Sequence, residues 1–122
     1  MNYNVLGTGY TVKIINNNER EEFPDLTEEM DGYCNYYTKE IIVVREDDDM
    51  QGYDEYVEQV VRHELVHAYL YESGLHEYST DETLVDWIAI QMPKMAETFS
   101  GKSKKEKVIY HLDNGLTEEH YV

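Results

Sequence analysis

The sequence predicts an α+β fold: a small, mostly antiparallel sheet of three strands packed on one long helix, followed by a second helix. Two observations predict it. Residues 8–45 contain three β-prone runs separated by polar segments, and residues 54–97 carry apolar side chains at helical spacing. A chain of 122 residues has the usual length of one domain, so we expect a single domain over residues 1–122.

The first strand is expected at residues 8–15, where Tyr10, Val12 and Ile14 alternate with polar residues. A period of two is typical of a strand with one buried face. Residues 16–30 are polar and predict a loop with at most a short helix.

Two more strands are expected within residues 32–44, where the runs GYCNYY and EIIVV can pair as an antiparallel hairpin. The four apolar residues 41–44 predict a strand covered on both faces, whereas residues 33–37 predict a more exposed edge. The acidic residues 46–49 lack the spacing of a calcium-binding loop, so we expect a solvated loop there.

Two helices follow the sheet. Asp54 is the expected N-cap of the first, at residues 54–73, and Gly74 can end it in a left-handed conformation. The second, at residues 80–97, carries apolar side chains three and four apart until Pro93 kinks or ends it.

The tail, residues 100–122, begins with the basic stretch SGKSKKEK, which we expect to be a solvated linker or helix end. A short strand and a turn at Asn114-Gly115 are expected after it. The role of this tail stays open.

The charge of the chain excludes two classes of partner. Its 26 acidic and 10 basic residues give a formal net charge of -16, which repels nucleic-acid phosphates and anionic membranes alike. Cys34 is the only cysteine, and the N-terminal residues lack the pattern of a secretory signal. No apolar stretch approaches the roughly 20 residues that span a bilayer. We expect a protein of the reducing cytoplasm that binds neither nucleic acid nor membrane; the sequence leaves its oligomeric state open.

The stretch HELVH, residues 63–67, is the strongest chemical signal in the chain. His63 and His67 are one helical turn apart and can direct both imidazoles at one ion, as zinc requires. Glu64 lies beside that ion and can take a proton from bound water. A random shuffle of this composition would contain H-E-x-x-H in roughly 3% of cases, so the motif needs a third ligand to support it.

The third ligand is expected from the second helix, where Glu82 and Asp86 share one face that also carries apolar residues. The short connection before this helix brings its start near the first helix, within reach of the ion. Glu82 is the favoured ligand. Two alternatives stay open: Glu82 closes a capping box with Ser79, or Asp86 is the ligand instead.

The stretches VVRHELVHAYLYESG and DETLVDWIAIQMP resemble the zincin metallopeptidases of the gluzincin kind. The resemblance covers about residues 40–95 and is greatest to the small ImmA/IrrE-type proteins and related short metallopeptidase-like proteins of phages and prophages. In that family the second helix reads roughly E-x-x-A-N-x-F-A. Val85, Asp86 and Ile88 depart from it here, which leaves subfamily and substrate open.

The resemblance implies a minimal zincin-like fold that holds one Zn²⁺ per chain. It implies His63, His67 and Glu82 as zinc ligands and Glu64 as the catalytic glutamate. It also implies a sheet packed on the active-site helix, and a place in the cytoplasm of a bacterium or a phage-infected cell.

The chemistry expected from such a site is hydrolysis of peptide bonds in a protein or peptide substrate. Zinc would polarise the scissile carbonyl and acidify its water, and Glu64 would move the proton to the leaving amine. Tyr71, His76 and Tyr78 are candidates to support the oxyanion, though spacing distinguishes none of them. A substrate backbone could add to the expected edge strand at residues 32–37.

Two hypotheses about a different kind of function stay open. One is a catalytically silent, zinc-stabilised protein-binding module, against which the presence of Glu64 argues, because a structural zinc site needs no base. The other is an acidic decoy that mimics nucleic acid, suggested by the net charge of -16. A decoy should tolerate His63→Ala and fail when surface acids such as Asp47 and Asp49 are neutralised; a peptidase should do the reverse.

Overall fold

The computed structural model describes residues 1–46, 53–101, 107–111 and 117–121. The chain forms two compact units, Met1–Ile90 and Gln91–Val122. Within the described residues, no helix is both long and apolar enough to cross a membrane.

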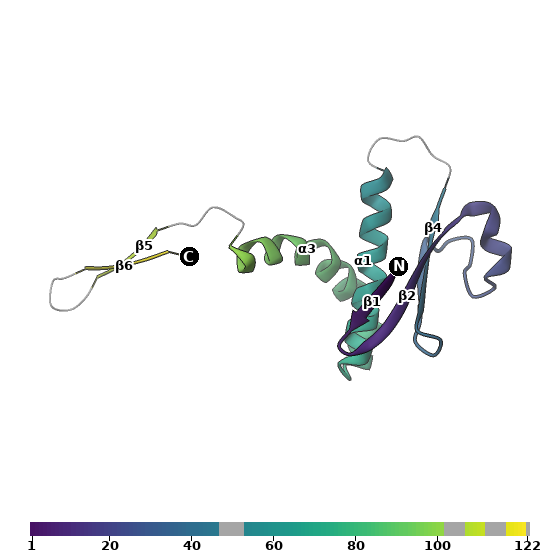
Figure 1. The fold of residues 1–122 in the computed structure, drawn as a ribbon, viewed down its shortest axis with the longest axis horizontal. Helices are drawn as coiled ribbons and strands as arrows, with labels where there is room; N and C mark the ends of the chain where they lie inside the picture. Colours follow the sequence, from purple (N-terminus) through teal and green to yellow (C-terminus); the bar gives the residue numbers. More distant parts are fainter. Residues whose placement is uncertain (47–52, 102–106, 112–116, 122) are drawn as a thin grey trace. The chain divides into compact units, whose positions relative to one another are not determined.

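The first unit contains a four-stranded sheet in the order β1-β2-β4-β3. Figure 1 labels β1, β2 and β4 of this sheet. The strands are β1 (Asn2–Val5), β2 (Thr8–Asn16), β3 (Gly32–Asn35) and β4 (Glu40–Arg45). The two hairpins β1/β2 and β3/β4 are antiparallel, whereas the central pair β2/β4 is parallel. The predicted α+β class, the hairpin and the edge position of β3 are confirmed.

The prediction of a three-stranded sheet is wrong. It omitted β1, and the observed sheet is mixed, because β2 and β4 are parallel. The sequence NYNV of β1 is short and largely polar. Its pairing depends on the two-residue loop before β2, where Leu6 and Gly7 have positive φ angles of 51° and 92°. Such loops match the twist of a hairpin, although a leucine at the first position gives no sequence signal.

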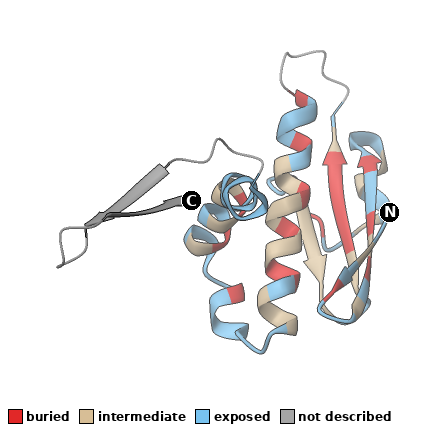
Figure 2. Cartoon of the chain, turned by 60° about the vertical axis from the view of Figure 1, so that its left-hand side comes forward, coloured by how far each residue is buried: buried red, intermediate tan, exposed pale blue. Residues whose placement is uncertain are grey.

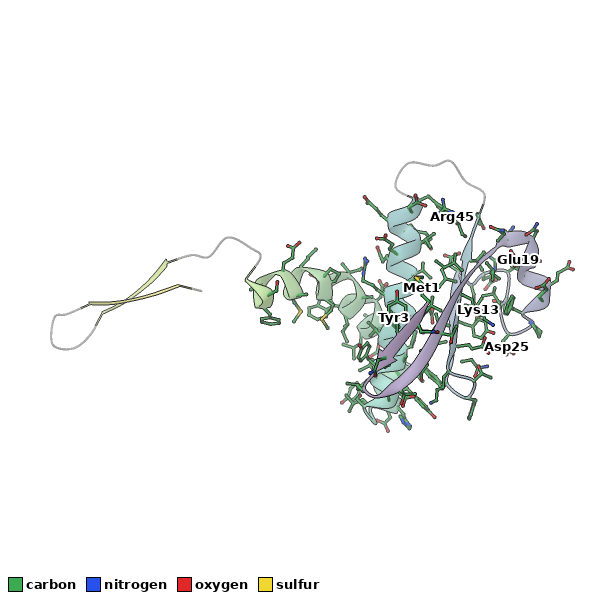
Figure 3. All side chains as sticks on the ribbon, in the orientation of Figure 1. Met1, Tyr3, Lys13, Glu19, Asp25 and Arg45 are labelled. Carbon is green, nitrogen blue, oxygen red and sulfur yellow. The ribbon has the colours of Figure 1, made fainter. Side chains whose placement is uncertain are left out.

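The sheet is covered on both faces. Helix α1 (Tyr53–Glu72) packs on one face, and the segment that contains the 3₁₀ helix η1 (Asn17–Glu22) covers the other (Figures 1 and 2). Figure 3 labels Glu19 and Asp25 in that segment. Strand β4 contributes to both sides, which confirms its predicted double burial. The buried cores are Val5, Tyr10, Val12, Ile41, Val43, Tyr53, Val57, Val61 and Ala68 on the α1 side, and Ile15, Leu26, Ile42 and Val44 on the other.

One predicted core residue in β2 is wrong. Tyr10 and Val12 are buried as expected, but Ile14 is 44% exposed, and its neighbour Ile15 is buried instead. Ile15 pairs with Val44 and faces the segment with η1. The alternation did not predict the burial of Ile15, because it assumed that only one face of the sheet is covered.

Helix α1 ends as predicted but begins differently. The N–H of Leu75 donates to Leu70 O at 2.9 Å, and that of Gly74 donates to Tyr71 O at 3.1 Å. With φ of 84° at Gly74, this is the Schellman ending of a helix. Asp54 is not the N-cap, because it lies in the first turn and forms an ion pair with Arg45.

A short helix that the sequence did not predict, α2 (His76–Ser79), precedes α3 (Glu82–Ser100). The N-cap of α3 is Asp81, whose Oδ1 accepts the N–H of Leu84 at 3.1 Å. This corrects the predicted start near residue 80. Helix α3 also continues through Pro93 to Ser100 rather than ending there.

The second unit contains the end of α3 and an antiparallel hairpin of β5 (Lys107–His111) and β6 (Thr117–Tyr121). The sequence predicted one short strand here. The predicted turn at Asn114-Gly115, the basic residues 102–106 and the acidic residues 47–49 lie outside the described residues.

Candidate metal centre

Three side chains bring nitrogen and oxygen atoms together in the first unit. His63 and His67 lie one turn apart on α1, and their Nε2 atoms are 3.3 Å from each other. Glu82, the first residue of α3, places Oε2 2.9 Å from His63 Nε2 and Oε1 3.1 Å from His67 Nε2. The three predicted ligands therefore meet at one point, although they come from two helices.

The other ring nitrogens of the histidines are engaged elsewhere. His67 Nδ1 lies 2.5 Å from the carbonyl oxygen of Ser79, which can only accept, so Nδ1 carries the proton and Nε2 is left with its lone pair. His63 Nδ1 lies 3.4 Å from Asp86 Oδ1. Both rings thus present Nε2 to Glu82. Hydrogen bonds of this kind orient metal-binding histidines in proteins.

The alternative roles of Glu82 and Asp86 can be compared with this geometry. Ser79 is buried within α2 and Asp81 caps α3, so the capping box between Ser79 and Glu82 does not form. Asp86 contacts Nδ1 of His63, the ring nitrogen that does not face Glu82. It does not belong to the group of His63, His67 and Glu82, whose ligand atoms lie within 4.8 Å of one another. The structure therefore places Asp86 where it can orient His63.

The group formed by His63, His67 and Glu82 could hold one metal ion. Zinc binds imidazole nitrogen and carboxylate oxygen at about 2.0 to 2.2 Å, so two ligand atoms on a tetrahedron are roughly 3.3 to 3.5 Å apart. His63 Nε2 lies 2.9 Å from Glu82 Oε2, His67 Nε2 lies 3.1 Å from Glu82 Oε1, and the two Nε2 atoms are 3.3 Å apart, so each histidine faces a different oxygen of the carboxylate. Burial lowers the pKa of His67, which favours the neutral imidazole that a metal needs.

Glu64 lies on α1 beside these ligands and is only 6% exposed. Burial, and secondly the charge of Glu82, raise its pKa to about 8. Strand β3 comes close to α1 at this point, because Gly32 has no side chain. A Cβ there would stand 3.1 Å from Val60 Cγ1 and 3.4 Å from Glu64 Cγ. The glycine allows the edge strand to pack over the glutamate.

These residues line a groove of about 540 Å³ between α1 and the edge of the sheet. One wall is the α1 face with Val60 and Glu64, and the other comes from β3 and the turn after it, including Cys34 and Tyr36. Cys34 packs against the core, and burial raises the pKa of its thiol to about 12. The thiol is therefore protonated and a poor nucleophile at neutral pH.

The residues predicted to support an oxyanion do not line this groove. Tyr71 is stacked between Tyr36 and His76, with ring centroids 4.3 and 4.4 Å apart, and Tyr78 is 52% exposed. Sequence reasoning overlooked Tyr36, which does line the groove. Strand alternation could have found it, because Gly32, Cys34 and Tyr36 are each two residues apart.

Comparison of the chain with protein-family models, with curated proteins and with solved structures found no match. The zincin resemblance therefore stays a prediction, and the function has to be argued from the geometry of the site.

Proposed function

We propose that the protein is a zinc-dependent metallopeptidase of the zincin type. The observation that carries this proposal is the convergence of three ligand atoms, from His63, His67 and Glu82, within 4.8 Å of one another. Three such ligands would hold one tetrahedral zinc ion and leave its fourth position for water or substrate. Glu64, buried in the same groove, supplies the base that a purely structural site would not need.

A zinc ion bound here would act as a Lewis acid on the scissile carbonyl and would acidify a water molecule. Glu64 takes the proton from the attacking water and delivers it to the amine nitrogen that leaves. Burial raises the pKa of Glu64 to about 8 in the metal-free protein, and a cation bound nearby would lower it. A general base works best with a pKa near the working pH.

The proposed substrate is an extended peptide segment of a protein. The groove runs beside β3, whose sheet partner among the described residues is β4, on one side. A peptide can add to the free edge of such a strand through backbone hydrogen bonds. This would bring its carbonyl groups past the site without requiring a particular side chain.

Elemental analysis of the purified protein tests the metal site. We expect about one zinc ion per chain in the wild type, and loss of that zinc in His63→Ala and Glu82→Ala. Glu58→Ala, an exposed glutamate on the same helix, is the matched control and should keep its zinc. A zinc content unchanged by Glu82→Ala would overturn the ligand assignment.

Hydrolysis is tested with the zinc-loaded protein on a mixture of unstructured peptides, with products read by mass spectrometry. Glu64→Gln should keep the zinc and lose cleavage, by at least about 100-fold if Glu64 is the general base. Glu58→Gln should cleave like the wild type. If the protein binds zinc but shows no cleavage that depends on Glu64, the peptidase proposal fails. The protein would then be a catalytically silent, zinc-stabilised binding module.

A further inference from the structure

The buried hydroxyl of Ser79 connects the metal site to the turn between β3 and β4. Ser79 is 2% exposed, and its Oγ donates to the backbone carbonyl of His67 at 3.1 Å. Its own carbonyl accepts His67 Nδ1. Two opposed hydrogen bonds thus join one residue of α2 to one residue of α1, and one of them fixes the ring of a proposed zinc ligand.

Tyr36 completes this arrangement. Its hydroxyl lies 2.6 Å from Ser79 Oγ. Because the single proton of the Ser79 hydroxyl is donated to His67, Tyr36 must be the donor in this bond. We propose that Tyr36 is a positioning residue for the metal site, which fixes Ser79 and through it the orientation of His67. This inference rests on the proposed function, since it assigns a role within the same site.

The ring of Tyr36 is held by packing that is independent of its hydroxyl. It stacks on Tyr71 of α1 with a centroid distance of 4.3 Å and an interplanar angle of 6°. Tyr71 in turn stacks on His76, the first residue of α2, at 4.4 Å and 8°. Lys39 Nζ lies 5.1 Å from the Tyr71 centroid. The aromatic ring should therefore keep its position when only the hydroxyl is removed.

The turn that carries Tyr36 is also ordered by side-chain contacts. Asn35 Oδ1 accepts the N–H groups of Tyr37 at 3.0 Å and Thr38 at 3.1 Å. Asparagine often stabilises turns in this manner. The hydroxyl of Tyr36 thus reaches α2 from a fixed backbone.

The same contacts bear on the third ligand. Ser79 is followed after two residues by Glu82, and α3 begins there. The hydrogen bonds between Ser79 of α2 and His67 of α1 therefore help to fix the position at which α3 begins, with Glu82. Loss of the Tyr36 hydroxyl should loosen both His67 and Glu82, while His63, which Asp86 contacts, is affected least.

The test compares Tyr36→Phe with Tyr56→Phe in zinc affinity, measured by competition with a chromophoric chelator. Tyr56 is the matched control, because it also lines the groove but its hydroxyl bonds to Asp31. We expect Tyr36→Phe to weaken zinc binding about 10- to 100-fold, as for other residues that orient ligands. Tyr56→Phe should change it less than about twofold. Wild-type affinity in Tyr36→Phe, or equal losses in both variants, would overturn the proposal.

Two further measurements separate positioning from a general loss of structure. Ser79→Ala should weaken zinc binding at least as much as Tyr36→Phe, because it also removes the hydrogen bond to the His67 carbonyl, and the double variant should be no worse than Ser79→Ala alone. The absorption bands of the Co²⁺-substituted protein should change in Tyr36→Phe and stay unchanged in Tyr56→Phe. Additive losses, or identical Co²⁺ spectra, would contradict the role assigned to Tyr36.

A readout without metal distinguishes failure of this inference from failure of the proposed function. Nitrogen NMR of the metal-free protein reports which ring nitrogen of His67 carries the proton. We expect the Nδ1–H form in the wild type and in Tyr56→Phe, and a mixture of tautomers in Tyr36→Phe. If the wild type bound no zinc, the peptidase proposal would fail, and the His67 tautomer would still decide whether Tyr36 positions this ring.

Discussion

Gly32 of β3 lies directly against Glu64 of α1, and the fit leaves no room for a side chain. A Cβ on Gly32 would stand 2.9 Å from the backbone oxygen of Ile42 and 3.4 Å from Glu64 Cγ. The first distance is too short for real atoms, and the oxygen belongs to the paired strand β4, which cannot move away easily. A side chain at Gly32 would therefore press on β4 and on Val60 of α1, whereas Glu64 would be in ordinary contact with it.

Gly32→Ala should destabilise the protein by about 1 to 3 kcal/mol, the usual cost of overpacking a tight contact. Gly9→Ala is the control, because a Cβ there meets nothing within 4 Å. Urea unfolding of both variants measures the difference. Equal stability of the two variants would mean that β3 does not approach α1 as closely as described.

The ionisation of Glu64 should make the metal-free protein less stable as pH rises. Its pKa is raised to about 8 in the fold, mainly by burial, from an ordinary value of 4.5. The folded state therefore holds a proton that the unfolded state releases, so stability present below about pH 4.5 is lost as pH rises to about 8. The slope for one such group is at most about 1.4 kcal/mol per pH unit.

Glu64→Gln removes this titration and should gain stability relative to the wild type over the same pH range. Chemical denaturation with a chelator present, at several pH values between about 4.5 and 8, measures it. A difference between the two proteins that does not change with pH would contradict the raised pKa.

Glu72, at the end of α1, should contribute stability with the opposite pH dependence. Its carboxylate accepts from Lys39 Nζ at 2.6 Å, from Tyr10 at 2.7 Å and from Thr8 at 3.2 Å. The hydrogen bond from Lys39, followed by that from Tyr10, lowers the pKa of Glu72. The contribution is therefore complete above the ordinary pKa of 4.5 and is lost as pH falls through the lowered value.

Glu72→Gln should thus destabilise the protein at neutral pH and have less effect in acid. Glu77→Gln, on the exposed side of α2, is the control and should be neutral throughout. Thermal unfolding at about pH 7 and about pH 3 compares them. An effect of Glu72→Gln that is as large in acid as at neutral pH would argue against an ionic role.

Asp86→Asn should weaken zinc binding without abolishing it. Its carboxylate lies 3.4 Å from His63 Nδ1 and can orient this ring, whereas Glu82 touches both Nε2 atoms. We expect a loss of about tenfold for Asp86→Asn, in the range typical of groups behind a ligand. Glu82→Gln should lose far more. Chelator competition measures both, and a reversed order would make Asp86 the ligand.

The sequence predicted the parts of the site that depend on helical spacing. His63, Glu64 and His67 follow from the periodicity of one helix, and Glu82 follows from a short connection to the next. These relationships are local, so no knowledge of the sheet was required. Tyr36 depends instead on where a turn after β3 docks against α1 and α2, which single-sequence patterns do not report.

The errors in the fold have the same origin. Strand β1 is polar and exists because its hairpin loop tolerates positive φ at Leu6 and Gly7. Helix α2 is a single turn with no spacing pattern of its own. Ile15 is buried where Ile14 was expected to be. Alternation did not predict this, because it assumes one covered face, whereas Ile15 lies in the core on the second face. In each case tertiary contacts decided what local preference left undetermined.

The parallel pairing of β2 with β4 also has a consequence for how the chain folds. Thr11 pairs with Glu40 and Asn16 with Arg45, so the centre of the sheet closes between segments far apart in sequence, whereas both hairpins are local. Long-range pairing of this kind is slow, because loop entropy is lost before contacts compensate. Before β2 pairs with it, β4 is paired along one edge with β3. It then exposes four consecutive apolar residues, Ile41, Ile42, Val43 and Val44. Newly made chains should therefore aggregate through β4 when they are produced faster than this pairing forms.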